Sequence, residues 1–475
     1  MTQDWAPGIE KWLLFDELED SYRLEASQGV VPEWIQGSYY LNGPARFQRG
    51  ELQYRHWLDG DGMVRALHFG RGGVQFISRW VKTRKLLEEE ARERAVYRTF
   101  GTSFEEDLLR RGVMLEPPVN VSVYTLGTRL LAFAEQSIPF ELDPRTLETK
   151  GEFDFGGRLN EVSPFAAHAK LDPNSNAMVN FGISFSNTHP QLYVYEFDSS
   201  GGLTGRRRFR LEAPHTNHDF AITSRFAVFF LSPLELDFSR FWGEGLSVME
   251  ALTWRPEKVS TIFVVPRLNC DVPPFRISRE SGHCLHLINA FETGDRLYLD
   301  VLEFGNPIYP QYQPVPDFYQ SVDAGHPTRY VIDTQKGELL ECFQMQYDRS
   351  PDFPSVNPSE VGKPYTDFWM LGISHSGRPG RKFFDQLVRG SWEAGDVDDV
   401  YQAPKGVYLG GEPVHVPHPA GDSTGAIIIQ EFRADTDQVS FLIFDAENVS
   451  AGPVARLPLR QKTHPGFHAS FQSSH

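Results

Sequence analysis

Cysteine is scarce in this chain, and its scarcity narrows the class of protein. Among 475 residues there are three cysteines, Cys270, Cys284 and Cys342. They are too few and too irregularly spaced for a disulfide framework or for a cysteine-rich zinc site. The first residues also lack the basic and apolar stretches of a signal peptide. We therefore expect a reducing, cytoplasmic setting.

Long hydrophobic runs and an excess of basic charge are missing as well. No uninterrupted apolar run approaches the length of a transmembrane helix, so we expect a soluble or at most peripheral protein. The net charge of −17 argues against nucleic acid as a partner, because phosphate binding requires a basic face. An apolar patch could still meet a bilayer, so peripheral membrane contact remains an expectation.

Aromatic residues and short strand-like segments are abundant instead. The 36 Phe and 17 Tyr suit strands and an apolar binding cavity. Beyond residue 112 the chain alternates short apolar runs with Gly, Asp, Asn and Pro turns; examples are residues 130–135, 192–197, 226–231, 261–266, 296–304, 426–432 and 440–444. Such spacing is typical of an all-β barrel, sandwich or propeller, and at this length a β-propeller is favoured.

Three stretches interrupt this pattern. Residues 84–112 predict two helices, over 84–96 and over 103–111, the second with Ser103 as its N-cap. Residues 235–254 are rich in aromatic side chains and predict a loop with a short helix, and residues 306–319 are rich in Pro and Tyr. We interpret all three as cap insertions on one domain spanning 1–475. A satellite core under a long loop is an equally good interpretation of the last two.

Four histidines stand beside short strand-like runs, far apart in the chain: His168, His218, His286 and His468. A lone histidine in such a place is more often a structural residue than a metal ligand. The separations match no local zinc motif, but they suit one ligand from each of four propeller blades that converge on the axis.

Four neutral imidazoles would leave a divalent ion with its full charge. Zinc is normally satisfied by four ligands, whereas six-coordinate iron with four histidines keeps two positions open for oxygen or water. Carboxylates on the outer ring nitrogens would then fix the tautomers and offset the charge. The candidates are Glu135, Asp352 and Glu412.

Several motifs carry a resemblance to a known family. They are His56-Trp-Leu-Asp-Gly-Asp-Gly-Met63, His218-Asp-Phe-Ala-Ile-Thr223, His286-Leu-Ile-Asn-Ala-Phe-Glu292 and Gly411-Glu-Pro-Val414. Together they resemble the carotenoid cleavage oxygenases, nonhaem iron enzymes that split carotenoids, apocarotenoids and some stilbenes. The resemblance covers nearly the whole chain. It implies a seven-bladed propeller with a helical cap over its top face.

The resemblance also implies roles for individual residues. The four iron ligands of the family fall on His168, His218, His286 and His468, with one Fe(II) per chain and O₂ as co-substrate. The three outer-sphere carboxylates fall on Glu135, Asp352 and Glu412, and we expect Glu135 beside His218. The neighbouring His215, His283 and His464 do not match the motifs, and we interpret them as loop or surface residues.

Two departures from the family pattern stand out. Asp352 occupies a position where the family has Glu, so its imidazole, expected to be His286, must shift, take a bridging water or lose its partner. Leu41 replaces an Arg that usually precedes Asn-Gly-Pro, a change expected to alter structure rather than chemistry. Val121 matches the position near the open iron site where members carry Thr or Val.

The implied reaction inserts O₂ across an alkene and gives two carbonyl products. The expected substrate is an apolar isoprenoid held in a tunnel; its expected wall residues are Val121, Ala134, Phe238, Trp242, Trp254, Tyr309 and Tyr312. Stilbene-cleaving relatives carry a lysine where this chain has Ala134, which favours a carotenoid or apocarotenoid over a phenolic stilbene. A noncatalytic propeller that binds an apolar ligand is the alternative from another class. The sequence leaves the oligomeric state open.

Overall fold

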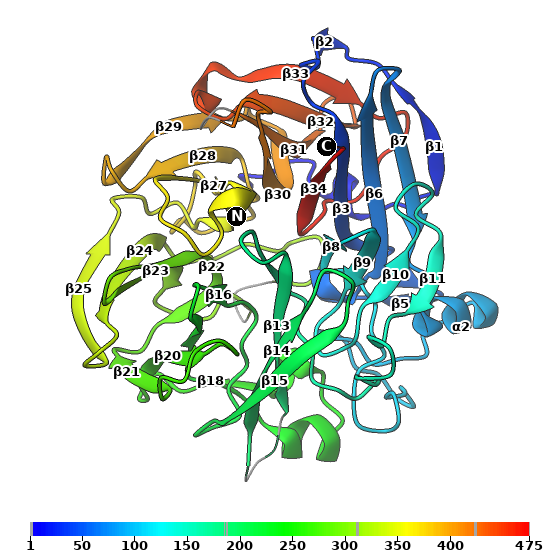
Figure 1. Cartoon of the computed structure of the whole chain (residues 1–475). Helices are drawn as coiled ribbons and strands as arrows, with labels where there is room; N and C mark the ends of the chain where they lie inside the picture. The colour runs from blue at the N-terminus through cyan, green and yellow to red at the C-terminus, as the bar shows by residue number, and fades with distance from the viewer. Residues whose placement is uncertain (1–2, 185, 187–188, 310–312, 422–424, 475) are drawn as a thin grey trace.

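The computed structural model describes residues 3–184, 186, 189–309, 313–421 and 425–474, and seven antiparallel sheets dominate them. The sheets surround a central axis as the blades of a propeller (Figure 1). The predicted all-β, seven-bladed fold is therefore confirmed. No helix among these residues is long and apolar enough to cross a bilayer.

The blades follow one another in chain order, and we number them sheets 1 to 7. From the innermost strand outward, sheet 1 is β34 (Ala469–Ser473), β3 (Gly37–Ala45), β6 (Asp61–Gly70), β7 (Gly73–Trp80) and β1 (Asp20–Leu24); sheet 2 is β8 (Ser122–Leu126), β9 (Arg129–Phe133), β10 (Phe140–Leu142) and β11 (Thr149–Glu152); sheet 3 is β12 (Lys170–Asp172), β13 (Ala177–Ser184), β14 (Gln191–Phe197) and β15 (Leu203–Arg210).

The remaining blades are built in the same way. Sheet 4 is β16 (Ala221–Ile222), β17 (Phe226–Leu231), β20 (Ser260–Pro266) and β21 (Phe275–Arg279); sheet 5 is β22 (His283–Thr293), β23 (Arg296–Phe304), β24 (Gly325–Asp333) and β25 (Glu338–Gln344); sheet 6 is β26 (Asp352–Ser355), β27 (Asp367–Gly372), β28 (Gln386–Ser391) and β29 (Asp396–Gln402); sheet 7 is β30 (Val407–Pro417), β31 (Gly425–Arg433), β32 (Gln438–Asp445), β33 (Pro453–Pro458) and β2 (Gln28–Gly29).

Two sheets close the ring by joining early and late parts of the chain. In sheet 1, β34 pairs antiparallel with β3, with Leu41 opposite Ala469. In sheet 7, β2 pairs with β33, with Gln28 opposite Arg456. Hydrogen bonding between strands so far apart in sequence fastens the first and last parts of the chain together and closes the ring.

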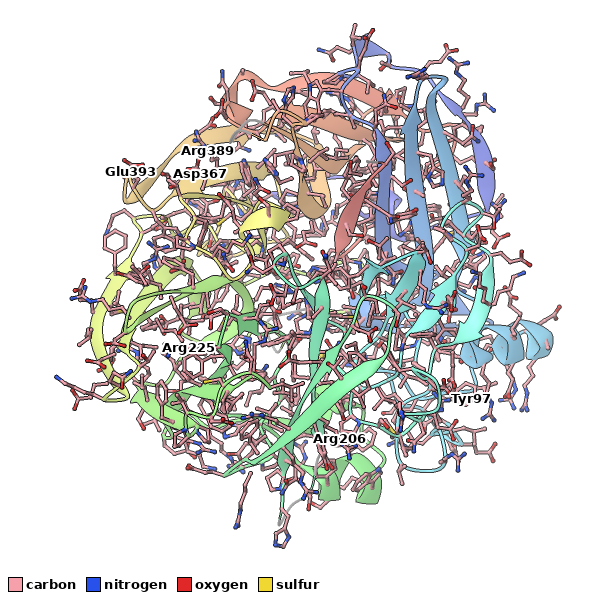
Figure 2. All side chains as sticks on the ribbon, in the orientation of Figure 1. Tyr97, Arg206, Arg225, Asp367, Arg389 and Glu393 are labelled. Carbon is pink, nitrogen blue, oxygen red and sulfur yellow. The ribbon has the colours of Figure 1, made fainter. Side chains whose placement is uncertain are left out.

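Residue patterns along the strands follow their position in a blade. All six residues of β17 are buried, because a middle strand is covered by the neighbouring sheets on both faces. The outermost strand β15 alternates half-buried and exposed residues, as expected where one face meets water. Charged pairs lie toward the rim; Arg389 and Asp367, 2.8 Å apart, are visible at the edge of the ring in Figure 2.

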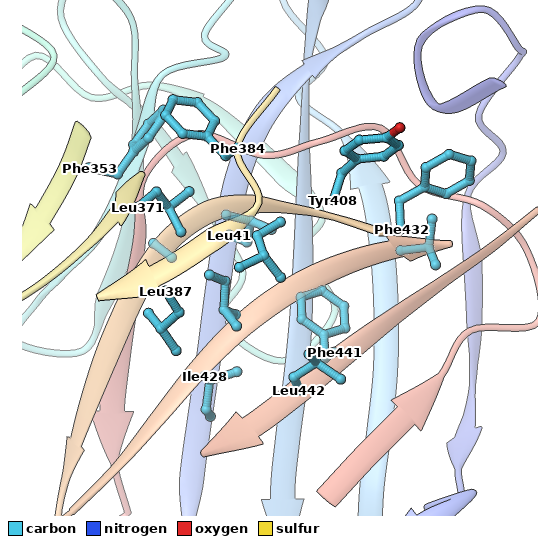
Figure 3. Close-up of a cluster of buried hydrophobic side chains, with 14 of the residues drawn as sticks. Leu41, Phe353, Leu371, Phe384, Leu387, Tyr408, Ile428, Phe432, Phe441 and Leu442 are labelled. Carbon is cyan, nitrogen blue, oxygen red and sulfur yellow. The ribbon is translucent and has the colours of Figure 1, made fainter. Parts of the chain in front are cut away.

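Hydrophobic clusters fill the spaces between adjacent blades. The largest cluster joins sheet 1 to sheets 6 and 7, and Figure 3 shows part of it, including Leu41, Leu371, Ile428 and Phe441. Leu41 is fully buried. An ideal Cβ on Gly466 would lie only 2.5 Å from its Cδ1 atom, so Leu41 packs directly against the backbone that leads to His468.

The helices are few and short. They are α1 (Glu10–Leu13), α2 (Arg84–Arg92) and α3 (Val248–Ala251), with a π-helical turn η2 (Ser239–Gly243) and 3₁₀ turns η1 (Trp57–Asp59), η4 (Pro358–Glu360) and η5 (Val449–Ala451). The stretch 235–254 holds η2, α3 and the two-stranded sheet of β18 (Leu234–Leu236) and β19 (Leu252–Trp254); β4 (Gln48–Arg49) pairs with β5 (Leu52–Gln53).

The helix predicted over 103–111 is wrong. The side chain of Asp107 accepts a hydrogen bond from the Phe104 backbone N–H at 2.9 Å and receives Arg98 at 2.8 Å. The backbone of Leu108 pairs with Val96 and Arg98 instead of forming a helical turn. An Asp side chain that binds nearby N–H groups competes with helix formation, and here it stabilises a turn.

Candidate metal centre

Four imidazole rings meet at the axis of the propeller. His168, His218 and His468 lie within a few residues before the innermost strands β12, β16 and β34, and His286 lies in β22. One ligand atom of each ring lies within 4.8 Å of the corresponding atoms of the other three. The four sequence-predicted ligands, spread over 300 residues of chain, are thus brought together by sheets 3, 4, 1 and 5.

Three carboxylates from the other three blades face the outer nitrogens of these rings. Glu135 Oε1 lies 2.5 Å from His218 Nδ1, and Asp352 Oδ1 lies 2.5 Å from His286 Nδ1. Glu412 Oε2 lies 3.4 Å from His468 Nδ1, and the same oxygen accepts a hydrogen bond from the Ala469 backbone N–H at 3.1 Å. Sheets 2, 6 and 7 therefore supply the carboxylates, and each blade contributes one residue to the centre.

The fourth ring has no close carboxylate. The nearest is Asp219, whose Oδ1 lies 3.7 Å from His168 Nδ1, beyond hydrogen-bond distance. Asp219 instead binds Lys170 Nζ at 2.8 Å and accepts the Leu287 backbone N–H at 2.9 Å. It thereby ties β12, the loop before β16 and β22 together beside the histidines. Asp219 belongs to the motif His218–Thr223, but the sequence did not reveal this bridge to β22.

Unusual backbone conformations accompany all three carboxylates. Gln136 follows Glu135 with a φ of 56°, Phe353 follows Asp352 with a φ of 51°, and Gly411 precedes Glu412 with a φ of 73°. The left-handed region is unfavourable for residues other than Gly and is found most often where function requires it. Glu135 and Asp352 lie at strand ends, whereas Glu412 lies within β30 at an irregularity between Gly410 and Val414.

Burial and charge set the protonation of the centre. Burial lowers the pKa of His168 well below 6.5, lowers that of His286, and brings that of His468 to about 3. Burial also opposes charge on His218, but the neighbouring Glu135 outweighs it and raises the pKa of His218. Burial raises the pKa of Glu412 to about 7. Three of the four rings are therefore neutral at pH 7, the form in which imidazole binds a metal.

The donor set fits a metal ion. A carboxylate beside Nδ1 holds the ring proton there and leaves the lone pair of Nε2 directed at the neighbouring rings. His168 Nε2 and His218 Nε2 lie 3.0 Å apart, and the buried Nε2 of His286 has no hydrogen-bond partner among the described residues. A cation would satisfy lone pairs that converge in a buried site. The ligand nitrogens of the four histidines lie within 4.8 Å of one another, which suits a single shared ion.

Cavities reach this centre from two directions. An apolar cavity of about 360 Å³ is lined by His218 and Glu135 together with Phe238, Phe241 and Leu285. A small cavity of about 30 Å³ continues from it and is lined by His218, His286, His468 and Val121. An axial cavity of about 200 Å³ touches His168, His286 and His468 beside Lys170 and Glu412. A molecule in the apolar cavity can therefore extend toward the histidines.

The structure separates the predicted tunnel residues into three groups. Phe238, Trp242 and Tyr309 line the apolar cavity, and Val121 lines the small cavity beside the histidines. Ala134 is buried in the hydrophobic cluster between sheets 1 and 2, and half-buried Trp254 lies at the end of β19, where Leu252 is the residue that lines the cavity. Tyr312 lies outside the described residues. Leu58, Phe100 and Leu285 also line the cavity; Leu58 lies in the motif His56–Met63, but the sequence did not predict that any of the three would line it.

The three neighbouring histidines are buried, so their interpretation as surface residues is wrong; His215 and His464 do lie in loops between named strands, whereas His283 does not. His283 is the first residue of β22 and is buried. His464 is fully buried, with Nδ1 2.9 Å from Glu17 Oε2 and its ring stacked on Phe15. His215 is buried and its Nδ1 donates to the Ser232 carbonyl at 3.0 Å. Each histidine lies near an inner strand, where adjacent blades cover the polar segment of sequence that surrounds it.

The contact of Asp352 contradicts two of the three alternatives expected for it. Its shorter side chain reaches His286 directly, at 2.5 Å, and the ring neither loses its partner nor requires a bridging water. The same Oδ1 accepts the Phe353 backbone N–H at 2.8 Å. The irregular pairing of β26 between Asp352 and Ser355, together with the left-handed Phe353, places the backbone close enough for Asp to suffice.

Comparisons with known proteins agree over nearly the whole chain. The family described as "Retinal pigment epithelial membrane protein" matches residues 14–473. The chain is 30% identical to an apocarotenoid-15,15'-oxygenase of Synechocystis over 485 residues, which cover 99% of this chain and 96% of that relative. It is 28% identical to an isoeugenol monooxygenase of Pseudomonas nitroreducens over 97% of both chains. A solved structure of cobalt-substituted Synechocystis ACO superposes with a TM-score of 0.89 at 27% identity, covering 99% of this chain and 100% of that one.

Proposed function

The chain belongs to the carotenoid cleavage oxygenase family, and from this membership we propose that it is an Fe(II)-dependent dioxygenase. The proposed reaction adds O₂ across one carbon–carbon double bond of a carotenoid or apocarotenoid and yields two carbonyl products. The observation that carries the proposal is the four-histidine centre at the inner end of an apolar cavity.

His168, His218, His286 and His468 would hold one Fe(II) per chain. When bound, iron would supply the activation of O₂, and four histidine ligands leave coordination positions open for this purpose. Glu135, Asp352 and Glu412 would keep the protons of three rings on Nδ1 and offset the positive charge. Asp219 would hold β12 and β22 in register around the site.

The rest of the chain's contribution is to bind and orient the alkene. Phe238, Phe241 and Leu285 would exclude water and hold an extended apolar molecule by burial of its surface. Val121 narrows the approach to the histidines and would fix the reacting double bond beside them. His283 and Cys284 line the cavity, but burial raises the pKa of the Cys284 thiol, which makes it a poor nucleophile and is in keeping with a reaction that needs none from the protein.

An isoprenoid substrate is favoured by the lining of the cavity, which is mainly aliphatic and aromatic. The alternative is cleavage of a phenylpropanoid or stilbene, and it is supported by the similarity to an isoeugenol monooxygenase. The resemblance places a phenol-binding lysine of stilbene-cleaving members at Ala134, but this residue packs between sheets 1 and 2, so the preference for the isoprenoid rests on the cavity lining. The two alternatives differ in the substrate, and the metal centre would be the same.

We further propose that the protein is cytoplasmic and contacts a membrane at the mouth of the apolar cavity. Three exposed apolar side chains line this cavity: Val113, Val162 and Trp242. An exposed apolar patch around the entrance of an apolar cavity suits transfer of a lipid-soluble substrate from a bilayer.

The experiment that tests the function combines metal analysis with product analysis. The protein is loaded with Fe(II) and incubated with ¹⁸O₂ and a panel of carotenoids, apocarotenals, isoeugenol and stilbenes, and the products are identified by mass. Two carbonyl products from a carotenoid or apocarotenal, each with labelled oxygen, would support the proposal. Cleavage of the phenolic substrates alone would support the alternative, and binding of carotenoid without cleavage by iron-loaded protein would support a noncatalytic propeller.

A further inference from the structure

His283 is a buried polar side chain in the wall of the apolar cavity. It is 3% exposed and lines the cavity together with the next two residues of β22, Cys284 and Leu285. The pairing of β22 is irregular between Cys284 and Leu287, so successive residues do not alternate cleanly between the two faces. His283 thus borders the proposed substrate path only three residues before the proposed ligand His286.

Neither ring nitrogen of His283 has a hydrogen-bond partner among the described residues. Buried polar groups in native proteins are nearly always hydrogen-bonded, because an unpaired one loses its interaction with water without replacement. Burial also lowers the pKa of His283 to about 3, so the ring is neutral at pH 7 and offers one N–H donor and one bare acceptor nitrogen.

Three other polar side chains of the cavity wall are already engaged within the protein. Thr216 Oγ1 donates to the Leu234 carbonyl at 3.1 Å, and Asn217 Nδ2 donates to the Asp219 carbonyl at 2.7 Å. Cys284 Sγ donates to the His286 carbonyl at 3.2 Å. His283 therefore differs from these lining residues in keeping its hydrogen-bonding capacity for a molecule in the cavity.

We infer that His283 binds a hydroxyl group carried by an otherwise apolar substrate and thereby selects the double bond that is cleaved. A hydroxyl can donate to the bare nitrogen or accept from the N–H, so it satisfies whichever nitrogen faces the cavity. His283 and the proposed ligand His218 line the same cavity, so a hydroxyl held by His283 would stand at a fixed distance from the metal centre. A fixed distance between a polar anchor and the centre sets which bond of an extended polyene reacts.

This inference rests on the proposed function for its substrate class, and its test uses binding as well as turnover. A β-apocarotenal and its 3-hydroxy counterpart serve as probes, and their affinities are measured without oxygen by quenching of tryptophan fluorescence. The variants are His283→Leu, which removes both nitrogens at similar volume, and His283→Asn, which restores a donor and an acceptor. The control is His415→Leu, because His415 is also buried with unpartnered ring nitrogens but lines the axial cavity instead.

We expect His283→Leu to weaken binding of the hydroxylated probe by roughly fivefold to tenfold more than it changes binding of the parent aldehyde. His283→Asn should recover part of the difference, and His415→Leu should show none of it. In turnover, KM for the hydroxylated probe should rise while kcat changes little. A wild-type protein that binds both probes equally, or a variant that weakens both equally, would overturn the inference. Hydroxyl-dependent binding without cleavage of either probe would support the role of His283 and refute the carotenoid-cleaving function.

Discussion

The contact between Asp352 and His286 is the most direct point at which to perturb the centre. Asp352 is buried, and its Oδ1 lies 2.5 Å from His286 Nδ1. Burial alone would raise the pKa of Asp352, but His286 outweighs it and lowers that pKa, so the side chain is ionised at pH 7. Replacing Asp352 with Ala leaves the Nδ1–H of His286 buried without an acceptor, at a cost of about 1–3 kcal/mol.

In this variant the tautomer of His286 with its proton on Nε2 becomes more favourable. That tautomer has no lone pair on the nitrogen directed at the other histidines. Loss of such a partner lowers metal affinity by roughly 10- to 100-fold, equivalent to about 1.4–2.7 kcal/mol of binding free energy. We expect Asp352→Ala to lose iron at chelator concentrations that the wild-type protein tolerates. The iron affinity of Asp352→Asn should fall between those of the wild-type protein and Asp352→Ala. The Asn amide oxygen can accept the hydrogen bond from His286, but it does not offset the charge of the metal.

The measurement is a titration of Fe(II) against a competing chelator, with iron content confirmed by elemental analysis. Asp348→Ala is the matched control, because Asp348 is an exposed acid on the same segment whose nearest cation is Arg349 at 3.5 Å. Equal iron affinities for the wild-type protein and Asp352→Ala, with both proteins folded, would refute the reasoning.

Three further outcomes follow from the described contacts. Glu17→Gln should lower the free energy of unfolding at pH 7 by about 3 kcal/mol, because Arg65 is fully buried and Glu17 binds it through both carboxylate oxygens. Burial raises the pKa of Glu17 but Arg65 and His464 lower it below 4.5, so this contribution is present above pH 4.5 and should shrink as the pH falls below that value, as urea unfolding at pH 7 and pH 4 would show. Trp242→Ser should reduce sedimentation with lipid vesicles several-fold, whereas Leu340→Ser, on the outer strand β25, should not. Fe(II) at 100 times its dissociation constant should raise the free energy of unfolding by about 2.7 kcal/mol in calorimetry, and a chelator should reverse the gain.

The sequence predicted the propeller and the inner ends of its strands well, because these depend on local patterns. Short apolar runs with turn residues between them mark the strands of each blade. The phrases around His218 and His286 adjoin such runs, so their position near the axis could be predicted. The convergence of four rings required the family resemblance, since separations of 50 to 182 residues carry no geometric information of their own.

What the sequence could not predict depends on contacts between distant segments. Ser103 looked like a helix N-cap, but its hydroxyl donates to Glu250, 147 residues away, at 3.4 Å. His283, His215 and His464 looked peripheral because polar residues surround them in the chain, whereas adjacent blades cover them in space. The reach of Asp352 depended on a left-handed Phe353, and a backbone angle at such a position follows from packing rather than from residue type.

The closure of the ring by β34 has a consequence for the order of assembly. His168, His218 and His286 are synthesised well before His468, which directly precedes β34. Until β34 has been synthesised, one edge of β3 has no partner strand, and the three earlier histidines form an incomplete ligand set. Arrival of β34 pairs that edge and delivers the fourth imidazole in the same event. Tight binding of iron would therefore require a closed propeller. A nascent chain whose ring is still open would lack the fourth ligand and would not hold a redox-active ion tightly.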